Sequence, residues 1–298
     1  MPTRTRTMTA LLGLAAASAL ALTGCASNSE GGGPTGTVTG TVSKDNAAAG
    51  AVPANITSRG TIIAAINAPY APNEFVQNGK VVGFDIDLMT AIAKSLGLKI
   101  QFKQSDFDQI IPRIQGGTYD AGTSSFTDTK ERQKSVDFVD YYNAGVLWAS
   151  PKGKTVDPLN ACGLRVSVQS TTYEQTDELP ALSKKCTAAG KKAITIVPYT
   201  DQDEATNALV LGKVDAMSAD SPVTLYAIKQ TGGKLQAAGE LREAAPYGWA
   251  VKKGSTLATA FKGALEALIA DGTYLQICKK WGVEAGAVTS VKINGGSI

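Results

Sequence analysis

The feature of this sequence that most constrains its fold is a repeated alternation of short apolar runs with amphipathic helical patterns. Residues 61–66 (TIIAAI) form an apolar run suited to a strand that is covered on both faces. Residues 83–98 then show helical periodicity, with Asp85 and Asp87 in the first turn, where the helix dipole favours anions. The residues on the apolar face of this helix are Ile86, Met89, Ile92, Ala93 and Leu96. With a further strand at 99–103, this order predicts βαβ units in an α/β fold with a mostly parallel sheet.

The alternation continues to the C-terminus. Residues 107–115 predict a helix whose inward-facing residues are Phe107, Ile110, Ile111 and Ile114. Strand patterns follow at 164–169, 193–197 and 214–219, with a helical pattern at 203–212. The segment 257–282 predicts an amphipathic helix, a break at Gly272 and a second short helix. Roughly 240 residues from Ile56 onward are enough for one large or two modest domains.

Two segments share the motif Gly-x-x-Asp-Ala, at 117–121 and at 212–216. Each follows a helical pattern and introduces a short strand. Five residues beyond the aspartate, the first copy reaches Ser125 and the second reaches Asp220. Ligands of open α/β sheets bind beyond the carboxyl ends of strands. If the match is a true repeat, two similar lobes present these loops to one cleft; a helix–glycine–strand junction is common enough that chance is the alternative.

The N-terminal residues predict a secretory signal peptide at 1–24. Arg4 and Arg6 precede a short apolar run that ends in LTGC. This ending resembles the bacterial lipobox, in which the cysteine, here Cys25, becomes the lipid-bearing first residue; an ordinary secretion signal is the alternative. Residues 25–55 are rich in Ser, Gly, Thr, Asn and Ala, which predicts a flexible tether behind the lipidated cysteine.

The charge balance and the absence of histidine argue against several function classes. The chain has 29 Lys and Arg against 26 Asp and Glu, and removal of Arg4 and Arg6 with the signal leaves an almost neutral body. A nucleic-acid partner would require a basic face, so we expect none. The sequence contains no histidine, the commonest general base and metal ligand. Hydrolase and metalloenzyme functions are therefore disfavoured, and we expect no metal or cofactor.

Three cysteines remain once Cys25 is set aside. A location outside the cytoplasm permits disulfides. Cys162 precedes a predicted strand and Cys186 follows a helical pattern, so we favour a Cys162–Cys186 pair with Cys278 as a buried thiol on the last helix. Sequence alone does not fix the pairing.

The stretch SSFTDTKER (124–132) concentrates hydroxyl groups beside one arginine, Arg132. A structural explanation is available, because Asp128 and Glu131 have the spacing of a helix capping box. On this stretch alone the helix-capping interpretation is the stronger one. A ligand-binding role for Arg132 depends on evidence from the rest of the chain.

From about Ile56 to Gly282 the chain resembles the polar-amino-acid solute-binding proteins of ABC importers, bacterial extracellular solute-binding protein family 3. The resemblance rests on the order and spacing of several segments: VVGFDIDLMTAIAKSLGL, DFDQIIPRIQGGTYDA, SSFTDTKERQKSVDFVDYY, VSVQS, SADSP, YGWAVKKG and DGTYLQICKKWG. It implies a two-lobed clamshell of the type II periplasmic-binding-protein class, with two crossing hinge strands near 142–146 and 243–247. Lobe 1 would comprise 56–142 and 248–298, and lobe 2 would comprise 147–243.

The resemblance also implies how a zwitterionic ligand is held. In the family, the arginine of a T-x-x-x-x-R segment pairs with the ligand α-carboxylate, and here that segment runs from Thr127 to Arg132. A planar guanidinium can bind a carboxylate through two parallel bonds. Thr127 would add its hydroxyl and N–H to the same carboxylate. The carbonyl of Ser125 would accept from the ammonium, and Asp220 would be the counter-ion of that ammonium.

The ligand side chain would lie between two aromatic rings. Tyr70 and Phe107 match the family's aromatic positions, and for Phe107 the less favoured alternative is a core-facing residue of its helix. Several relatives carry an acidic residue after the first strand, where this chain has Asn67. Because an amide cannot neutralise a buried cation, this weakens the case for lysine or arginine and favours a neutral polar ligand, with an acidic one open.

One loop departs from the family pattern. The usual Q-x-G-T-T loop reads Gln169-Ser170-Thr171-Thr172-Tyr173 here. Either Thr171 replaces the glycine or one residue is missing, so the N–H that meets the carboxylate belongs to Thr172 or to Tyr173.

We therefore expect an extracellular, lipid-anchored binding protein that delivers a polar amino acid to ABC permease subunits and contacts the membrane through its lipid. The sequence identifies neither the amino acid nor the permease. An alternative on the same fold is a cyclohexadienyl-dehydratase-like enzyme, which removes water from prephenate-like acids. Such an enzyme needs a well-placed acid or base, and the sequence offers no evident one beyond Asp220. A sensor domain, the other alternative, would come with a transmembrane helix and a signalling module.

Overall fold

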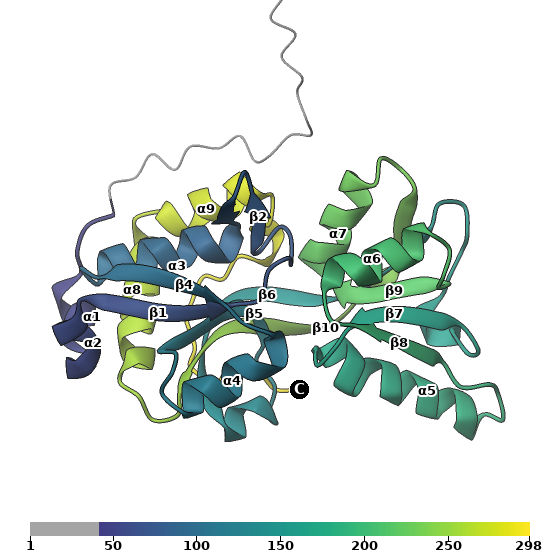
Figure 1. Cartoon of the computed structure of the whole chain (residues 1–298), viewed down its shortest axis with the longest axis horizontal. Coiled ribbons are helices and arrows are strands. Elements are labelled where there is room, and N and C mark those ends of the chain that lie inside the picture. Colours follow the sequence, from purple (N-terminus) through teal and green to yellow (C-terminus); the bar gives the residue numbers. More distant parts are fainter. Residues whose placement is uncertain (1–41) are drawn as a thin grey trace, which may run out of the picture. The chain divides into compact units, whose positions relative to one another are not determined.

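The computed structural model describes residues 42–298 (Figure 1). The predicted signal peptide, Cys25 and the tether up to residue 41 lie outside the described residues. Eight strands of the described part form one sheet in the order β4-β1-β5-β10-β6-β9-β7-β8, and β2 and β3 form a hairpin. The strands are β1 (Thr61–Ile66), β2 (Phe75–Gln77), β3 (Lys80–Val82), β4 (Lys99–Gln104), β5 (Ala121–Thr127), β6 (Val136–Pro151), β7 (Arg165–Gln169), β8 (Thr195–Tyr199), β9 (Ala216–Asp220) and β10 (Leu235–Lys252).

The helices occupy most of the segments that periodicity predicts. They are α1 (Asn46–Gly50), α2 (Ala54–Arg59), α3 (Phe84–Ser95), α4 (Phe107–Gln115), α5 (Leu179–Ala188), α6 (Gln202–Val210), α7 (Ser221–Gln230), α8 (Leu257–Ala270) and α9 (Thr273–Trp281). Short 3-10 turns lie at Arg132–Lys134, Pro158–Asn160 and Glu284–Gly286, and a π-helical turn at Glu174–Glu178 leads into α5. Gly272, with φ of +81°, separates α8 from α9 as predicted.

Within residues 42–298 the eight-stranded sheet is mixed, with four parallel strand pairings and three antiparallel ones. Strands β4, β1 and β5 run parallel to one another, and so do β9, β7 and β8. Between them, β10 is antiparallel to both β5 and β6, and β6 is antiparallel to β9. The predicted parallel order holds within each triplet, and the antiparallel pairings come from the two long central strands, which carry the chain from one triplet to the other and back. We call the β4-β1-β5 triplet with its helices lobe 1, and the β9-β7-β8 triplet with its helices lobe 2.

The register of the central strands brings the carboxyl ends of both triplets together. Thr127, the last residue of β5, pairs with Tyr247 of β10, which pairs with Tyr142 of β6. Asp220, the last residue of β9, pairs with Val146 of β6. The two triplets therefore run in opposite directions and end within a few residues of each other along β6. Loops that leave β5 and β9 consequently meet in the middle of the sheet.

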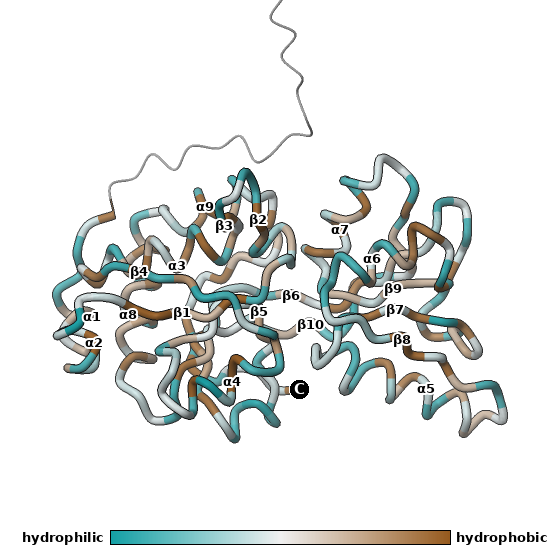
Figure 2. Tube along the Cα trace, in the orientation of Figure 1, coloured by the Kyte–Doolittle hydropathy of each residue, from teal (hydrophilic) through white to brown (hydrophobic). Residues whose placement is uncertain are grey.

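Helices cover both faces of the sheet, as the α/β pattern requires. The predicted apolar face of α3 is buried, and all of its residues except Ile86 pack with α8 and α9 in one cluster of lobe 1. On the other face, α4 buries Ile110 and Ile114, whereas Phe107 and Ile111 are half-buried. In lobe 2, α5 alternates hydrophobic and hydrophilic residues along its length (Figure 2), and its buried residues are Leu179, Leu182 and Cys186. One-sided burial of this kind orients each helix on the sheet.

The segment before β1 contradicts the prediction of a tether that extends to residue 55. Val42, Ala48 and Val52 are buried in the same cluster as α3 and α8. Asp45 caps α1, because its Oδ1 accepts from the N–H groups of Ala47 (2.9 Å) and Ala48 (3.0 Å). Residues 42–55 are thus ordered by small apolar side chains that pack on α3 and α8 and by one capping aspartate.

The structure joins the favoured pair of cysteines. The sulfurs of Cys162 and Cys186 are 2.02 Å apart, and Cys278 is a buried free thiol on α9, as predicted. Between residues 42 and 298, none of the helices combines the length and the apolar character that crossing a membrane requires.

Candidate ligand-binding site

A cavity lies where the carboxyl ends of the two strand triplets converge. Its lining comes from both lobes: Asn67, Tyr70, Phe107, Ser124, Ser125, Thr127, Arg132, Gln169, Thr172, Tyr173 and Asp220. The structure therefore brings together all ten residues that the sequence predicts for the ligand site. Ser124 is the one lining residue that the sequence reasoning missed.

Strand ends position most of these side chains. Asn67 directly follows β1, Ser125 and Thr127 end β5, Gln169 ends β7 and Asp220 ends β9. Parallel neighbours in a sheet finish at the same edge, so residues distant in sequence reach one opening. The local pattern of a buried strand followed by polar residues is the signal by which sequence can locate such an edge.

Arg132 enters the cavity from the short turn after β5. Its Nη1 donates to the carbonyl of Thr127 (2.9 Å), and its Nη2 donates to the carbonyl of Thr171 in lobe 2 (3.0 Å). The guanidinium carbon lies 5.6 Å from the ring centre of Phe107 and 5.6 Å from that of Phe126. Burial lowers the pKa of Arg132 from its ordinary value, but an arginine in a protein stays protonated. The site thus holds a fixed, planar cation.

The capping-box explanation of this stretch does not hold. The N–H of Arg132 donates to the Thr129 hydroxyl (3.2 Å). Asp128 instead accepts from the Gln133 side chain (2.8 Å) and from the N–H of Gly296 (2.8 Å). Glu131 pairs with Lys134 at the surface. The spacing of Asp128 and Glu131 is therefore incidental, which leaves Arg132 without a capping role.

The opposite wall of the cavity is acidic. Asp220 is 6% exposed and accepts a hydrogen bond of 2.5 Å from the Tyr70 hydroxyl. Burial raises the pKa of Asp220, and the carboxyl of Glu174 is a second buried acidic group that influences it. Glu174 is 1% exposed, and burial followed by the charge of Asp220 raises its pKa well above the usual range. Sequence reasoning missed Glu174, because nothing in its helical surroundings signals that it faces a distant strand end.

The two lobes contact each other through residues of the cavity itself. Besides Tyr70 with Asp220, the Gln169 amide nitrogen donates to the side-chain oxygen of Asn67 (2.7 Å). The Asn67 amide nitrogen in turn donates to the carbonyl of Ser105 (3.0 Å). Because these groups satisfy one another, the polar cavity is held closed by the same atoms that would meet a ligand.

The loop that departs from the family pattern has a strained residue where the family has glycine. Thr171 has φ of +63°, in the left-handed region that β-branched residues rarely adopt. Its N–H donates to Gln175 Oε1 (2.9 Å), and its carbonyl accepts from Arg132. Of the two alternatives left open by the sequence, this conformation favours the one in which Thr171 replaces the glycine.

Comparisons with known proteins fit this arrangement. The profile of bacterial extracellular solute-binding proteins, family 3, matches residues 62–284. The chain belongs to this family. The arginine-binding protein ArgT of Corynebacterium glutamicum is 39% identical over 295 residues, which cover 97% of this chain and 96% of that protein. The fold class predicted from the sequence, a two-lobed α/β binding protein, is therefore confirmed.

Two solved structures of similar proteins differ in the bound amino acid. An ancestral arginine-binding protein bound to arginine is 38% identical, has a TM-score of 0.68, and the match covers 75% of this chain and 98% of that one. An ancestral arginine-binding protein bound to glutamine is 40% identical with a TM-score of 0.67, and covers 76% and 99%. These family members are binding proteins, not enzymes, so the chain is a binding protein and the dehydratase alternative is set aside.

Proposed function

We propose that this protein captures a free polar amino acid at the outer face of the cell membrane and delivers it to an ABC permease. The observation that carries the proposal is that Arg132 and Asp220 line one cavity from opposite lobes. A zwitterion needs both charges matched in a cleft from which water is excluded, because an unpaired buried charge costs several kcal/mol. A fixed cation facing a buried carboxyl provides that match.

Each ligand group has a proposed partner. Arg132 would exchange its bond to the Thr171 carbonyl for the ligand α-carboxylate, with Thr127 and the N–H of Thr172 or Tyr173 as further donors. Asp220 would exchange the Tyr70 hydroxyl for the ammonium, which would also donate to the Ser125 carbonyl. An ammonium has three donors and no acceptor, so a carboxylate and a carbonyl suit it.

The ligand side chain would lie between Tyr70 and Phe107 and reach the Gln169–Asn67 pair. A side-chain amide can insert into an amide–amide hydrogen bond without leaving a charge unmatched. We therefore propose a neutral amide amino acid such as glutamine. Arginine is the second candidate, favoured by the name of the Corynebacterium glutamicum relative and by the second buried carboxyl at Glu174.

Isothermal titration calorimetry with each of the common amino acids tests the function. Arg132→Ala should abolish binding of every ligand that the wild type accepts, with a loss of at least about 3 kcal/mol, as for breaking a buried pair. The matched control is Lys134→Ala in the same turn, which removes an exposed lysine paired with Glu131. An affinity of Arg132→Ala within threefold of wild type would contradict the proposed role, and a wild type that binds no amino acid would contradict the function.

Capture would proceed by closure of lobe 1 (56–142 and 248–298) onto lobe 2 (147–243) about the two central strands. The proposal is supported by β6 and β10, which are the strands that pass between the triplets. Because the two ligand charges are matched together when the lobes meet, ligand shifts the population toward the closed form. Small-angle scattering should give a smaller radius of gyration with ligand than without it. An unchanged radius at saturating ligand would contradict closure.

We further propose that the protein is retained at the cell surface by lipidation of Cys25 and carries the Cys162–Cys186 disulfide when secreted. A disulfide that closes a loop of about 25 residues contributes roughly 3 kcal/mol to stability. Cys25→Ser should release the protein into the medium. Peptide mapping without reductant should recover the 162–186 cross-link, and three free thiols would contradict the pairing.

A further inference from the structure

A buried carboxylate behind the cavity, that of Asp85, is used by none of the roles assigned above. Asp85 lies in the first turn of α3 and is fully buried. Its Oδ2 accepts from the N–H of Ser125 (2.9 Å) and from the Ser125 hydroxyl (3.1 Å). The Tyr141 hydroxyl, from β6, lies 2.8 Å from each of its oxygens. One carboxylate thus joins a helix start, a cavity residue and a central strand.

Ser125 has a backbone conformation that requires support. Its φ is +49°, in the left-handed region that residues other than glycine seldom adopt. Such a conformation persists where surrounding contacts determine it. Asp85 takes both of the hydrogen-bond donors of Ser125, and these are the contacts that hold the residue. The direction of the Ser125 carbonyl at the cavity wall therefore depends on Asp85.

The start of α3 fixes the position of Asp85 itself. Gly83 has φ of +146°, and a Cβ at this position would lie 1.9 Å from the carbonyl oxygen of Asn73. The N–H of Asp85 donates to that same oxygen (3.0 Å). A close backbone approach at Gly83 thus clamps the first turn of α3, whose N–H groups also favour a carboxylate there.

We propose that Asp85 is a positioning residue for ligand binding: it holds Ser125 so that its carbonyl faces the ligand ammonium, and through Tyr141 it ties that carbonyl to β6. The inference rests on the proposed function, since it assigns Ser125 the role of ammonium acceptor. It explains why a carboxylate is buried here. Three donors point at Asp85, and an asparagine would offer them one uncharged oxygen where the carboxylate offers two charged ones.

The groups that face Asp85 make its effect depend on pH. They are Tyr141 from β6, Glu74 from the segment between β1 and β2, and Asp220 from β9. Burial is the largest influence and raises the pKa of Asp85 to about 7. The form that accepts three donors is the ionised one, so ligand binding favours loss of the proton. The contribution of Asp85 to affinity should be complete well above pH 7 and should disappear as the pH falls through it.

The experiment compares Asp85→Asn with Asp87→Asn in the same helical turn. Asp87 accepts from Lys280 and Trp281 on α9 and lies outside the cavity lining, so it controls for loss of a first-turn carboxylate. Calorimetry with L-glutamine and L-arginine on the full chain should show Asp85→Asn at least about tenfold weaker than wild type at pH 8. At pH 5.5 the ratio should shrink to within about threefold, because protonated Asp85 resembles asparagine. Asp87→Asn should stay within about twofold at both pH values.

A rescue variant separates positioning from general support of the fold. Glycine adopts positive φ without strain, so Ser125→Gly in the Asp85→Asn background should recover much of the affinity lost at pH 8. Equal affinities of Asp85→Asn and wild type, a ratio independent of pH, or no recovery in the double variant would each overturn the inference.

A second variant tests the inference if Asp85→Asn does not fold, and the wild type tests the proposed function. If Asp85→Asn does not fold, Tyr141→Phe, which removes one donor and keeps the ring, should still weaken binding about threefold at pH 8 and not at pH 5.5; no change in either condition overturns the inference. A wild type that binds neither probe nor any other amino acid contradicts the proposed function instead.

Discussion

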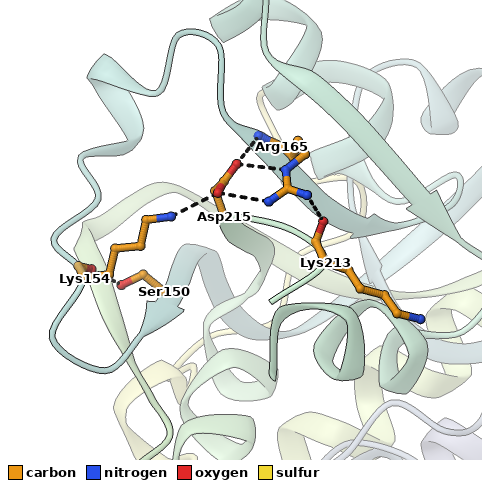
Figure 3. Close-up of polar contacts among 5 residues, drawn as sticks. All are labelled: Ser150, Lys154, Arg165, Lys213 and Asp215. Carbon is orange, nitrogen blue, oxygen red and sulfur yellow. Dashed lines mark hydrogen bonds and ion pairs between the residues drawn. The ribbon is translucent and has the colours of Figure 1, made fainter. Parts of the chain in front are cut away.

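The two ends of strand β9 carry aspartates in opposite electrostatic surroundings. Asp215, just before the strand, accepts from Lys154 Nζ (3.0 Å), from Arg165 Nε (3.2 Å) and from the N–H of Arg165 (3.0 Å), as Figure 3 shows. Asp220, at the other end, is buried against the Tyr70 hydroxyl and the carboxyl of Glu174. Pairing with Arg165 lowers the pKa of Asp215, whereas burial raises that of Asp220. One carboxylate is matched within the protein, and the other has its cation supplied by the ligand we propose.

In lobe 1, the amino end of β5 carries an aspartate in surroundings similar to those of Asp215. Asp120, just before β5, pairs with Arg59 and accepts from the N–H of Ile63 in the neighbouring strand β1 (2.7 Å). Asp215 makes the same contact with the N–H of Arg165 in β7. The shared Gly-x-x-Asp-Ala motif therefore joins adjacent parallel strands at their amino ends. At the carboxyl ends the copies differ, with Ser125 in one and Asp220 in the other. The contact at the amino end thus occurs in both copies, whereas the side chain at the carboxyl end differs.

The largest effect should come from Asp220→Ala. We expect a loss of binding free energy of at least about 3 kcal/mol, since the ligand ammonium would be buried without its counter-ion. The stability of the empty protein should change little, because removal of the cost of burying the carboxyl offsets the lost Tyr70 hydrogen bond. Calorimetry and thermal unfolding measure the two quantities. Affinity within threefold of wild type would remove the distinction between the two ends of β9.

Asp215→Ala should have the complementary effect, with a loss of about 1–2 kcal/mol in unfolding free energy and unchanged affinity. Removal of this carboxylate leaves Lys154 and Arg165 close together without their shared anion, and it breaks the contact with β7. Urea unfolding of the ligand-free protein gives the stability change. Asp120→Ala is the matched variant in lobe 1 and should lose a similar amount. A weaker affinity in Asp215→Ala would mean that the amino end of β9 also serves the cavity.

The pH dependence of stability should differ in sign between the two aspartates. The folded pKa of Asp215 is lowered, so its stabilisation is present above the unfolded value of about 3.9 and is lost as the pH falls toward 2. Asp215→Asn should therefore remove about 1 kcal/mol of the acid-dependent stability loss of the wild type. The folded pKa of Asp220 is raised, so its ionisation destabilises the empty protein as the pH rises. Asp220→Asn should consequently gain stability relative to wild type from acid to neutral pH, as urea unfolding at each pH would show.

Local periodicity in the sequence predicted most of the helices and strands and the edge of the sheet at which the candidate site lies. The helix at 107–115 and the strand at 61–66 have the bounds that their patterns predict. The ten predicted site residues meet in one cavity because they follow strand ends or match short motifs. Periodicity did not reveal that the central strands are antiparallel, because β6 is buried along nearly its whole length and lacks the alternation of an antiparallel strand with one solvated face.

The features that the sequence did not predict depend on contacts with residues far away in the chain. Ser124 donates to Glu74, fifty residues earlier, with a bond of 2.6 Å, and Asp85 meets Ser125 forty residues later. In the sequence, a buried carboxylate such as Asp85 cannot be told from an ordinary acidic residue in the first turn of a helix, because its hydrogen-bond donors lie elsewhere in the chain. Residues 42–55 were likewise wrongly predicted as a flexible tether, because the surface that orders them is built by α3 and α8.

The smallest effect, and the sharpest test of matched against unmatched charge, is the response to salt. Exposed ion pairs are screened beyond a Debye length of about 10 Å at 0.1 M salt and about 3 Å at 1 M, whereas buried pairs are screened much less. Lys154 and Arg165 are each about half exposed, at 48%. The stability difference between wild type and Asp215→Ala should therefore shrink by a few tenths of a kcal/mol between 0.05 M and 1 M sodium chloride. The affinity ratio between wild type and Asp220→Ala should not change over the same range, because that charge meets its partner inside a closed cavity. A salt-dependent affinity ratio for Asp220→Ala would mean that water reaches the acidic wall with ligand bound. The charges at the two ends of β9 would then differ only in how strongly salt screens them.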